Sequence, residues 1–314
     1  MHGSAEIIPC KPDADNADVG SFFLLLKHYY IRIIKRRIFF MPEKLKTIMA
    51  IAGSDPTGGA GIQCDIRAGN SVGVHVLTAL TSVTVQNSRS LFSINPVPPD
   101  LLERQIYSIL EDAMPDAIKI GLIGSEKNME VISAFLSSLS PETPVVVDPI
   151  LLSSAGKKSM TETGMGLKDW LESYVELIFP KATVITPNLE ELNMMIRGKN
   201  NEKEFLKTLP ERFNTGAIVL KGGHSDSPVV TDKLITPNCI LEVSHPRKEC
   251  RNLHGSGCAY SSLLASYLAK GYPLNEAFSA ASNKIYSIIR ESVCYQLGTS
   301  NYGPLNINKY ETQF

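Results

Sequence analysis

The chain has 314 residues, of which 43% are hydrophobic, 20% charged and 7% aromatic. This composition is ordinary for a globular protein and excludes a fibrous or largely disordered chain. With 31 basic and 32 acidic side chains the formal charge is −1 at pH 7, so no nucleic-acid partner is expected.

Six cysteines are scattered along the chain and form neither a CxxC pair nor a Cys/His cluster at zinc-ligand spacing. They predict no disulfide framework and no structural zinc, and the expected compartment is a reducing cytoplasm. No apolar run reaches the length of a membrane span, so no membrane partner is expected.

The first forty residues differ from the rest of the chain. A polar stretch leads into Phe22–Leu26, and basic residues follow between 27 and 37. A secretory signal has the opposite order of basic and apolar residues. A basic amphipathic helix at a membrane surface is one interpretation, and a translated upstream segment is the one we favour. We therefore predict that 1–40 is an extension, disordered or not part of the native product, and that 41–314 is a single domain.

From Leu45 onward, short apolar runs alternate with helical patterns. Strands are predicted at 45–52, 72–86, 117–121, 144–148, 183–186 and 217–220, with a hairpin over 229–243. Helices are predicted at 62–71, from 97–100 onward, and at 128–139, 161–179, 189–196, 257–270 and 274–291. Continuous apolar strands that alternate with helices indicate a mainly parallel sheet covered on both faces. The predicted fold is one doubly wound α/β domain.

Ligands bind at the carboxyl ends of the strands in such sheets. Polar segments follow the expected strands at Gly53–Asp55, Gln86–Asn87, Lys119–Gly121, Asp148–Pro149, Thr186–Asn188, Lys221–His224 and His254–Cys258. Because these strand ends meet at one edge of a parallel sheet, we expect the segments to build one site.

The first glycine loop, Gly53–Gly61, has four glycines in nine residues. It is not a Walker A loop, because no lysine follows its last glycine, and Cys64 stands where a dinucleotide fingerprint would have glycine. Close approach of the backbone to a ligand is the functional interpretation, and a structural turn is the alternative.

The second glycine loop, Gly255-Ser256-Gly257, precedes a strongly helical stretch. Backbone N–H groups at a helix N-terminus form an anion site. Cys258 falls on the first turn, where we expect the helix dipole to lower the pKa of its thiol. A buried packing cysteine is the alternative.

Asn188 and Glu191 are three residues apart at another expected helix start. This spacing puts an amide and a carboxylate on one face, suited to holding Mg²⁺ through water beside phosphates. An ordinary helix cap by Asn188 is the alternative. Lys221 supplies a cation for a polyphosphate, and Asp148 ends an apolar strand where a charge is costly without a role.

These segments occur in order over about 45–305, and together they resemble the hydroxymethylpyrimidine/phosphomethylpyrimidine kinases of thiamine biosynthesis. The resemblance implies a ribokinase-like fold. It also implies a transferase that uses ATP and Mg²⁺ to phosphorylate 4-amino-5-hydroxymethyl-2-methylpyrimidine, and then its monophosphate to the diphosphate.

The resemblance also implies roles for individual residues. Cys258 takes the general-base position that most ribokinase-like enzymes fill with Asp, and Gly255, Ser256 and Gly257 form the anion hole. The amide of Gln86 is expected to read the pyrimidine edge. The remaining implied residues are Gly53 and Asp65 for the substrate, Asn188, Lys221 and Gly223 for ATP, and Glu191 and Asp148 for the metal.

The sequence departs from the family pattern at a few positions. Leu152–Gly156 stands where the family commonly has Lys-Ser-Gly, and a missing lysine there would weaken phosphate or lid contacts. Ser256 and Leu253 each replace a usual threonine, and Cys64 replaces a usual alanine and is expected only to pack.

Two other functions stay open. A pyridoxal or pyridoxine kinase of the same superfamily would share most of these motifs, and Val85–Asn87 favours the pyrimidine. A non-catalytic protein that senses a thiamine precursor would be expected to lose Cys258, the second glycine loop or Glu191, yet all are present. The expected partner is a small-molecule pyrimidine, and relatives of this kind allow a homodimer.

Overall fold

The computed structural model describes residues 44–87, 89–151, 166–198, 202–224, 227–293, 297 and 303–308. The expectation about residues 1–40 and the departure at Leu152–Gly156 lie outside the described residues.

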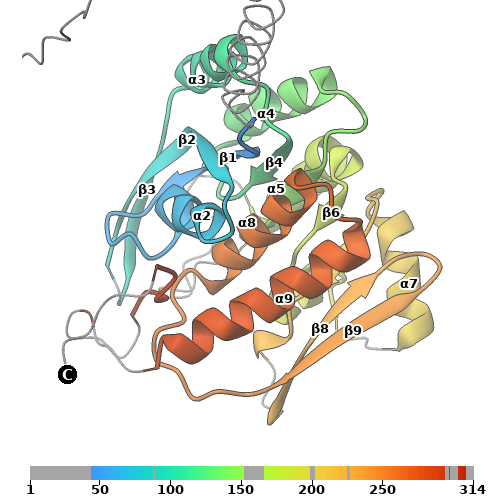
Figure 1. The fold of residues 1–314 in the computed structure, drawn as a ribbon. Coiled ribbons are helices and arrows are strands. Elements are labelled where there is room, and N and C mark those ends of the chain that lie inside the picture. Colours follow the sequence, from blue (N-terminus) through green and yellow to red (C-terminus); the bar gives the residue numbers. More distant parts are fainter. Residues whose placement is uncertain are drawn as a thin grey trace, which may run out of the picture. The chain divides into compact units, whose positions relative to one another are not determined.

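A nine-stranded sheet forms the centre of the described fold, in the order β3-β2-β1-β4-β5-β6-β7-β8-β9. Neighbours from β2 to β7 pair in parallel, whereas β3, β8 and β9 are antiparallel strands at the two edges (Figure 1). The strands are β1 (Thr47–Ser54), β2 (His75–Gln86), β3 (Leu91–Pro96), β4 (Ala117–Ile120), β5 (Val145–Val147), β6 (Val184–Ile185), β7 (Ile218–Leu220), β8 (Val229–Ile235) and β9 (Ile240–Pro246). The predicted mainly parallel sheet is confirmed.

Helices cover both faces of this sheet. One face packs against α3 (Pro99–Asp112), α4 (Glu126–Ser138), α5 (Leu167–Ser173), α6 (Leu189–Met195) and α7 (Lys203–Arg212). The other packs against α2 (Gly61–Asn70), α8 (Ser256–Ala269) and α9 (Leu274–Glu291). In β1, Met49 and Ile51 point to the first face and Ile48 and Ala50 to the second, as strand geometry requires. The doubly wound arrangement is therefore confirmed.

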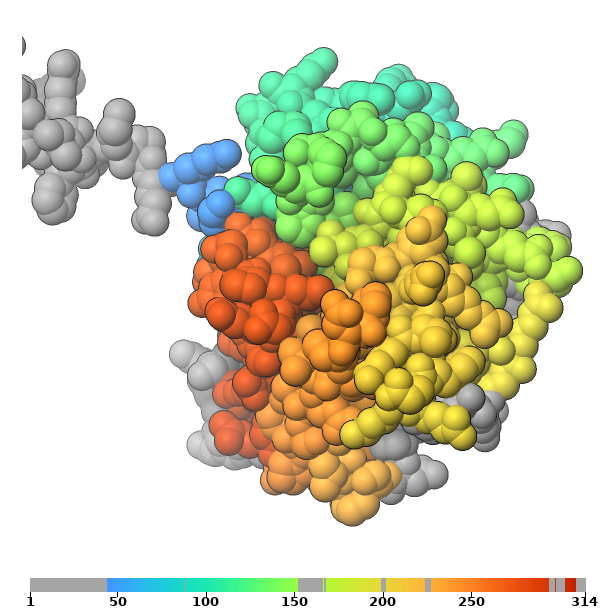
Figure 2. Space-filling model, turned by 90° about the vertical axis from the view of Figure 1, so that its right-hand side faces the viewer, coloured from blue at the N-terminus to red at the C-terminus, as the bar shows by residue number. Residues whose placement is uncertain are grey.

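The hairpin β8–β9 and the last helix lie side by side at one edge of the sheet. Helix α9 contacts both strands of the hairpin, and their surfaces adjoin in Figure 2. The hairpin predicted over 229–243 is thus present, and it continues to Pro246.

Among the described strands and α-helices, β3 and α7 were not predicted. Strand β3 is a short edge strand whose side chains are mostly accessible, so it lacks the apolar run that marks a buried strand. Helix α7 is polar, contains Pro210 and buries only Leu206, Leu209 and Pro210 among its residues. The helix predicted over 161–179 begins at Leu167 in the described chain and passes into π and 3₁₀ turns, Tyr174–Ile178 and Phe179–Lys181.

The strand order reverses at β1. The chain runs from β1 to β2 on one side, and β4 then pairs with the opposite side of β1. Such a switch point leaves a crevice beyond the carboxyl ends of the strands. Gly53 and Gly121, at the ends of β1 and β4, therefore mark the expected place for a ligand.

Candidate active site

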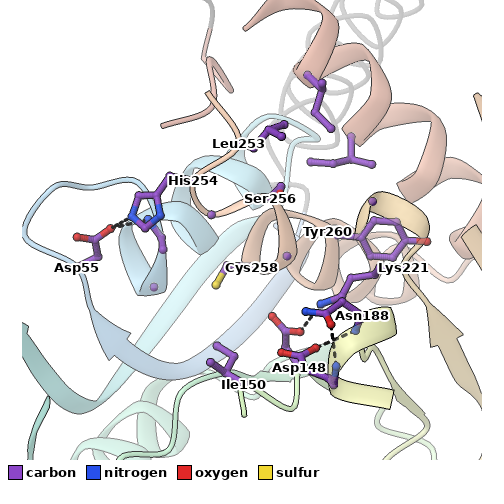
Figure 3. A pocket seen from close by; sticks show the side chains of 18 of the residues that line it. Asp55, Asp148, Ile150, Asn188, Lys221, Leu253, His254, Ser256, Cys258 and Tyr260 are labelled. Atoms are coloured by element: carbon purple, nitrogen blue, oxygen red, sulfur yellow. Dashed lines mark hydrogen bonds and ion pairs between the residues drawn. The ribbon is translucent and has the colours of Figure 1, made fainter. Parts of the chain in front are cut away.

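A cavity of about 400 Å³ lies at the carboxyl ends of the strands, beneath the N-terminus of α8. Most residues predicted for the site line it: Gly53, Gln86, Asp148, Asn188, Glu191, Lys221, Gly223, Gly255, Ser256, Gly257 and Cys258. Segments more than two hundred residues apart in the sequence, such as those of Gly53 and Cys258, therefore meet in one cavity. Figure 3 shows Cys258 between Asp55 and His254 on one side and Asp148 and Lys221 on the other.

Asp65 is a correction to the predicted substrate site. Its side chain is completely buried on α2 and does not line the cavity. Both carboxylate oxygens accept hydrogen bonds from Lys119 Nζ at 2.9 Å. Asp65 lies in the motif, but the helix turns its side chain toward the sheet, so it faces a lysine and no open space.

The first glycine loop folds around the carboxylate of Asp55. Thr57 and Ala60 donate backbone N–H groups to Asp55 at 2.8 Å, and His254 Nε2 lies 2.8 Å from Asp55 Oδ2. Burial alone would raise the pKa of Asp55, but the hydrogen bonds from His254, Thr57 and Ala60 lower it to about 2. Asp55 is therefore an ionised carboxylate that joins the two glycine loops.

Glycines allow these two loops to touch. Gly255 has φ +82°, in the left-handed region, and a side chain there would overlap the carbonyl oxygen of Gly59. A side chain at Gly59 would in turn overlap the imidazole of His254. The first loop thus makes a close backbone contact with the second glycine loop, and its approach to a ligand stays a prediction.

Helix α8 begins at Ser256, and the first three residues of the helix line the cavity. Ser256 N–H donates to the carbonyl of Leu253 at 3.0 Å, and the N–H groups of Gly257 and Cys258 have no backbone acceptor among the described residues. Unpaired N–H groups at the positive end of a fourteen-residue helix suit a phosphoryl oxygen.

The Cys258 side chain is buried in the first turn of α8, with 8% of the residue exposed. Burial raises the pKa of the Cys258 thiol to about 11, while Lys119 and a hydrogen bond from the Gly61 N–H act in the opposite direction. The expectation that the helix terminus gives a lowered pKa is wrong for this structure, because removal from water is the larger effect.

Asp148 and Lys221 form an ion pair at the other side of Cys258. Lys221 Nζ lies 2.7 Å from Asp148 Oδ1, and Thr186 Oγ1 donates to the same oxygen at 3.2 Å. Although burial alone would lower it, Asp148 and Glu191 raise the pKa of Lys221, so its ammonium group stays charged. A side chain at Gly257 would come within 3.2 Å of Lys221 Nζ, so this cation adjoins the second glycine loop.

Asn188 and Glu191 form a capping box at the start of α6. Asn188 Oδ1 accepts from the Glu191 N–H at 2.9 Å, and Glu191 Oε2 accepts from the Asn188 N–H at 2.8 Å. The structural alternative is therefore present, and both residues also line the cavity. Burial raises the pKa of Glu191 to about 7, even though Lys221 opposes the shift.

The residues present fit a magnesium ion that is shared with phosphates. Within the described chain, no cluster of three or more His, Cys, Asp or Glu side chains could hold a metal alone. Asp148 and Glu191 are carboxylates that line the same cavity. Mg²⁺ in phosphoryl-transfer sites uses one or two carboxylates and takes its other ligands from phosphates and water, which matches this pair.

One wall of the cavity was not predicted at all. His245 of β9 and Tyr286 of α9 stack with ring centroids 4.2 Å apart, and Asp232 of β8 and Ser282 of α9 line the same wall. Tyr260 and Ser282 hydroxyls lie 2.7 Å apart. These residues belong to no motif and meet only because α9 packs on the hairpin, so the local sequence holds no signal for them.

The fold is that of ribokinase-like small-molecule kinases. The structure resembles a pyridoxal kinase from Staphylococcus aureus in complex with AMP-PCP and pyridoxal, with a TM-score of 0.73 and 26% identity over 85% of this chain and 95% of that one. It also resembles a phosphomethylpyrimidine kinase from Clostridium difficile 630, with a TM-score of 0.63 and 28% identity over 78% of this chain and 99% of that one.

The sequence places the chain in a narrower group. Residues 55–306 match the phosphomethylpyrimidine kinase family, and the chain belongs to that family. A hydroxymethylpyrimidine/phosphomethylpyrimidine kinase from Bacillus subtilis (strain 168) is 30% identical over 82% of this chain and 93% of its own length. A protein of the same name from Rhizobium meliloti (strain 1021) is 31% identical over 82% of this chain and 95% of its own. The resemblance seen in the sequence is confirmed.

Among the described residues, no helix is long and apolar enough to cross a membrane.

Proposed function

We propose that this protein is an ATP-dependent kinase that phosphorylates 4-amino-5-hydroxymethyl-2-methylpyrimidine and then its monophosphate, giving the diphosphate used to build thiamine. The observation that carries the proposal is the order of groups along one cavity. Gln86 lies at the β2 end of the sheet, Lys221 at the β7 end, and Cys258 between them, where α8 packs on β4 and β5.

The β1–β2 end of the cavity suits a flat, polar heterocycle. Thr84, Gln86, Leu91 and Ile94 line it together with Leu122. The Gln86 amide offers one acceptor and one donor, which match an amino group beside a ring nitrogen. Apolar contacts with a few polar groups are the usual composition of a small-molecule site.

The β6–β9 end of the cavity suits a nucleoside triphosphate. Lys221 supplies a charged ammonium group, and Asn188 and Gly223 line the cavity beside it. Asp148 and Glu191 would hold Mg²⁺, which would neutralise charge on the phosphates. The N–H groups of Gly257 and Cys258 would then bind the oxygens of the phosphoryl group in transfer.

In the proposed mechanism, Cys258 is the base of the first reaction. The substrate hydroxyl loses its proton to Cys258 Sγ as its oxygen bonds to the γ-phosphorus, and the bond from that phosphorus to the bridging oxygen of ADP breaks. The sulfur must be a thiolate at that moment, and because burial raises the pKa of the thiol to about 11, the thiolate is the minor form near neutral pH and needs stabilisation by its surroundings.

A pyridoxal kinase is the second candidate, because the structure of the S. aureus pyridoxal kinase matches with the higher TM-score of the two kinases compared above, 0.73 against 0.63. Both substrates are hydroxymethyl-bearing nitrogen heterocycles, so the general shape of the cavity admits either.

A coupled assay of ADP release with the pyrimidine, its monophosphate and pyridoxal, each alone and in competition, tests the proposal. We expect turnover of both pyrimidine compounds and a lower kcat/KM for pyridoxal. A preference for pyridoxal would replace the proposal by the second candidate. Tight binding of the pyrimidine without ADP release would indicate a non-catalytic sensor.

A further inference from the structure

A buried ion pair lies against the cavity and has no part in the function proposed above. Lys119 of β4 and Asp65 of α2 are both 0% exposed, and Lys119 Nζ lies 2.9 Å from each oxygen of the Asp65 carboxylate. Ser262 of α8 donates its hydroxyl to Asp65 Oδ1 at 2.7 Å. Three elements are therefore joined through one carboxylate.

Stability alone gives little reason for such a pair. Removing an ammonium and a carboxylate group from water costs free energy that their attraction only partly returns, and an apolar pair of similar volume is often as stable. The Lys119–Asp65 pair therefore points to an electrostatic effect on a neighbouring group of the cavity.

The functional group that we connect with this ion pair is Cys258. Lys119 lines the cavity together with Cys258, and α8 packs directly on β4. Ser262 follows Cys258 by four residues, so the two side chains lie one turn apart on the same face of α8. Asp65 takes two of the three N–H groups of the Lys119 ammonium, and no third acceptor pairs with it in the described part of the chain.

We propose that Lys119 is a positioning residue whose ammonium group, fixed by Asp65 and Ser262, stabilises the thiolate form of Cys258. The proposal rests on the proposed function, since it assumes that Cys258 is the base. When the substrate proton moves to Sγ, the thiolate charge is neutralised and the Lys119 charge is unchanged.

The charges around Cys258 agree with this role. Burial has the largest effect on the pKa of Cys258 and raises it. Lys119 has the next largest effect and lowers this pKa, whereas Asp148 and Asp65 raise it. Lys221, whose ammonium group adjoins the second glycine loop, and the Cys64 thiol of α2 also interact electrostatically with Cys258. Removing Lys119 and Asp65 together therefore leaves a net increase in the pKa of Cys258.

The test is the pH dependence of Cys258 alkylation by iodoacetamide in the full chain without substrate, followed by peptide mass. In Lys119→Met/Asp65→Asn both charges are gone and Ser262 keeps an acceptor. We expect alkylation of Cys258 at a fixed pH to slow about tenfold, because a rise of one unit in the pKa of the thiol lowers the thiolate fraction about tenfold. Asp65→Asn alone keeps Lys119, so alkylation of Cys258 should be faster in this variant than in the double variant.

A merely structural role predicts the opposite for the double variant, because loosened packing would expose Cys258 and speed its alkylation. Unchanged or faster alkylation of Cys258 in the folded double variant would overturn the proposal. If the double variant does not fold, Lys119→Gln/Asp65→Asn replaces it with the same expected slowing.

Two controls accompany the measurement. Lys46→Met/Asp116→Asn makes the same change in an ion pair of 2.8 Å at the protein surface, and it should leave Cys258 alkylation unchanged. The exposed Cys239 should react equally in every variant. Failure of the proposed function would look different: the parent chain would release no ADP with either pyrimidine, whatever the alkylation profiles show.

Discussion

Gln86, at the end of β2, can be tested without disturbing the nucleotide end of the cavity. Gln86→Leu keeps the size of the side chain and leaves the polar edge of the pyrimidine without partners. An unmade hydrogen bond costs about 1–3 kcal/mol, so we expect KM for the pyrimidine to rise roughly 5- to 150-fold while KM for ATP stays unchanged. Michaelis constants for both substrates decide this, and an unchanged pyrimidine KM would remove Gln86 from the site.

Glu191 combines a helix cap with a predicted metal contact, and one substitution separates the two. Glu191→Gln keeps an oxygen that can accept from the Asn188 N–H, so the cap and the melting temperature should persist. Loss of the charge should raise the Mg²⁺ concentration needed for half-maximal rate. The neighbouring Glu190 is exposed and does not line the cavity, so Glu190→Gln is the matched control. Equal magnesium dependence in the two variants would leave Asp148 as the candidate ligand.

At the scale of elements, the contact between the two glycine loops depends on Asp55. Its folded pKa is lowered from 3.8 to about 2, so its ionised form stabilises the fold above the unfolded pKa, and this contribution is lost as the pH falls from about 4 to 2. The shift corresponds to about 2 kcal/mol. We expect Asp55→Asn to be less stable than the parent chain at neutral pH, and the difference to shrink below pH 4.

Urea unfolding of both chains at several pH values measures this difference. His254 Nε2 lies against the Asp55 carboxylate, so the difference in unfolding free energy between the two chains reports on the Asp55–His254 pair. A difference in unfolding free energy that stays constant from pH 6 to pH 2 would show that the Asp55 charge does not join the loops.

The sequence allowed the strand ends to be predicted better than the cavity walls. Gly53, Gln86, Asp148 and Lys221 lie at the ends of apolar strands, so a local pattern was enough to predict that they meet at one edge of the sheet. The wall made by β9 and α9 depends on how a hairpin and a helix pack, which no local pattern encodes.

The two corrections have related causes. Membership of a motif does not show which way a helical side chain points, so Asp65 was placed in the substrate site although it faces Lys119. A position at a helix N-terminus indicates the direction of the dipole but not the burial of the thiol. Burial therefore reversed the predicted pKa of Cys258.

At the scale of the whole molecule, we predict that residues 1–40 are dispensable. Among the described residues, those that line the cavity all lie between Ala52 and Ile289, and the first described strand begins at Thr47. A chain that begins at Met41 should keep its melting temperature and its kcat/KM for the pyrimidine. Loss of folding or of most activity in the truncated chain would contradict this prediction.

The two reactions of the proposed kinase place different demands on the same site. In the first, the nucleophile is a neutral hydroxyl group that must lose a proton as the bond to phosphorus forms. In the second, the nucleophile is a phosphate, which is already largely ionised near neutral pH. The second reaction needs placement and charge neutralisation but no base.

Cys258→Ala, with each phosphorylation measured separately and the melting temperature beside it, tests the central role given to Cys258. We expect the hydroxyl step to slow by a factor on the order of 10²–10⁴, the usual contribution of a general base, and the phosphate step to slow by only about tenfold. The melting temperature should change little by comparison. Equal slowing of both reactions, or no slowing of either, would contradict the assignment of Cys258 as the base.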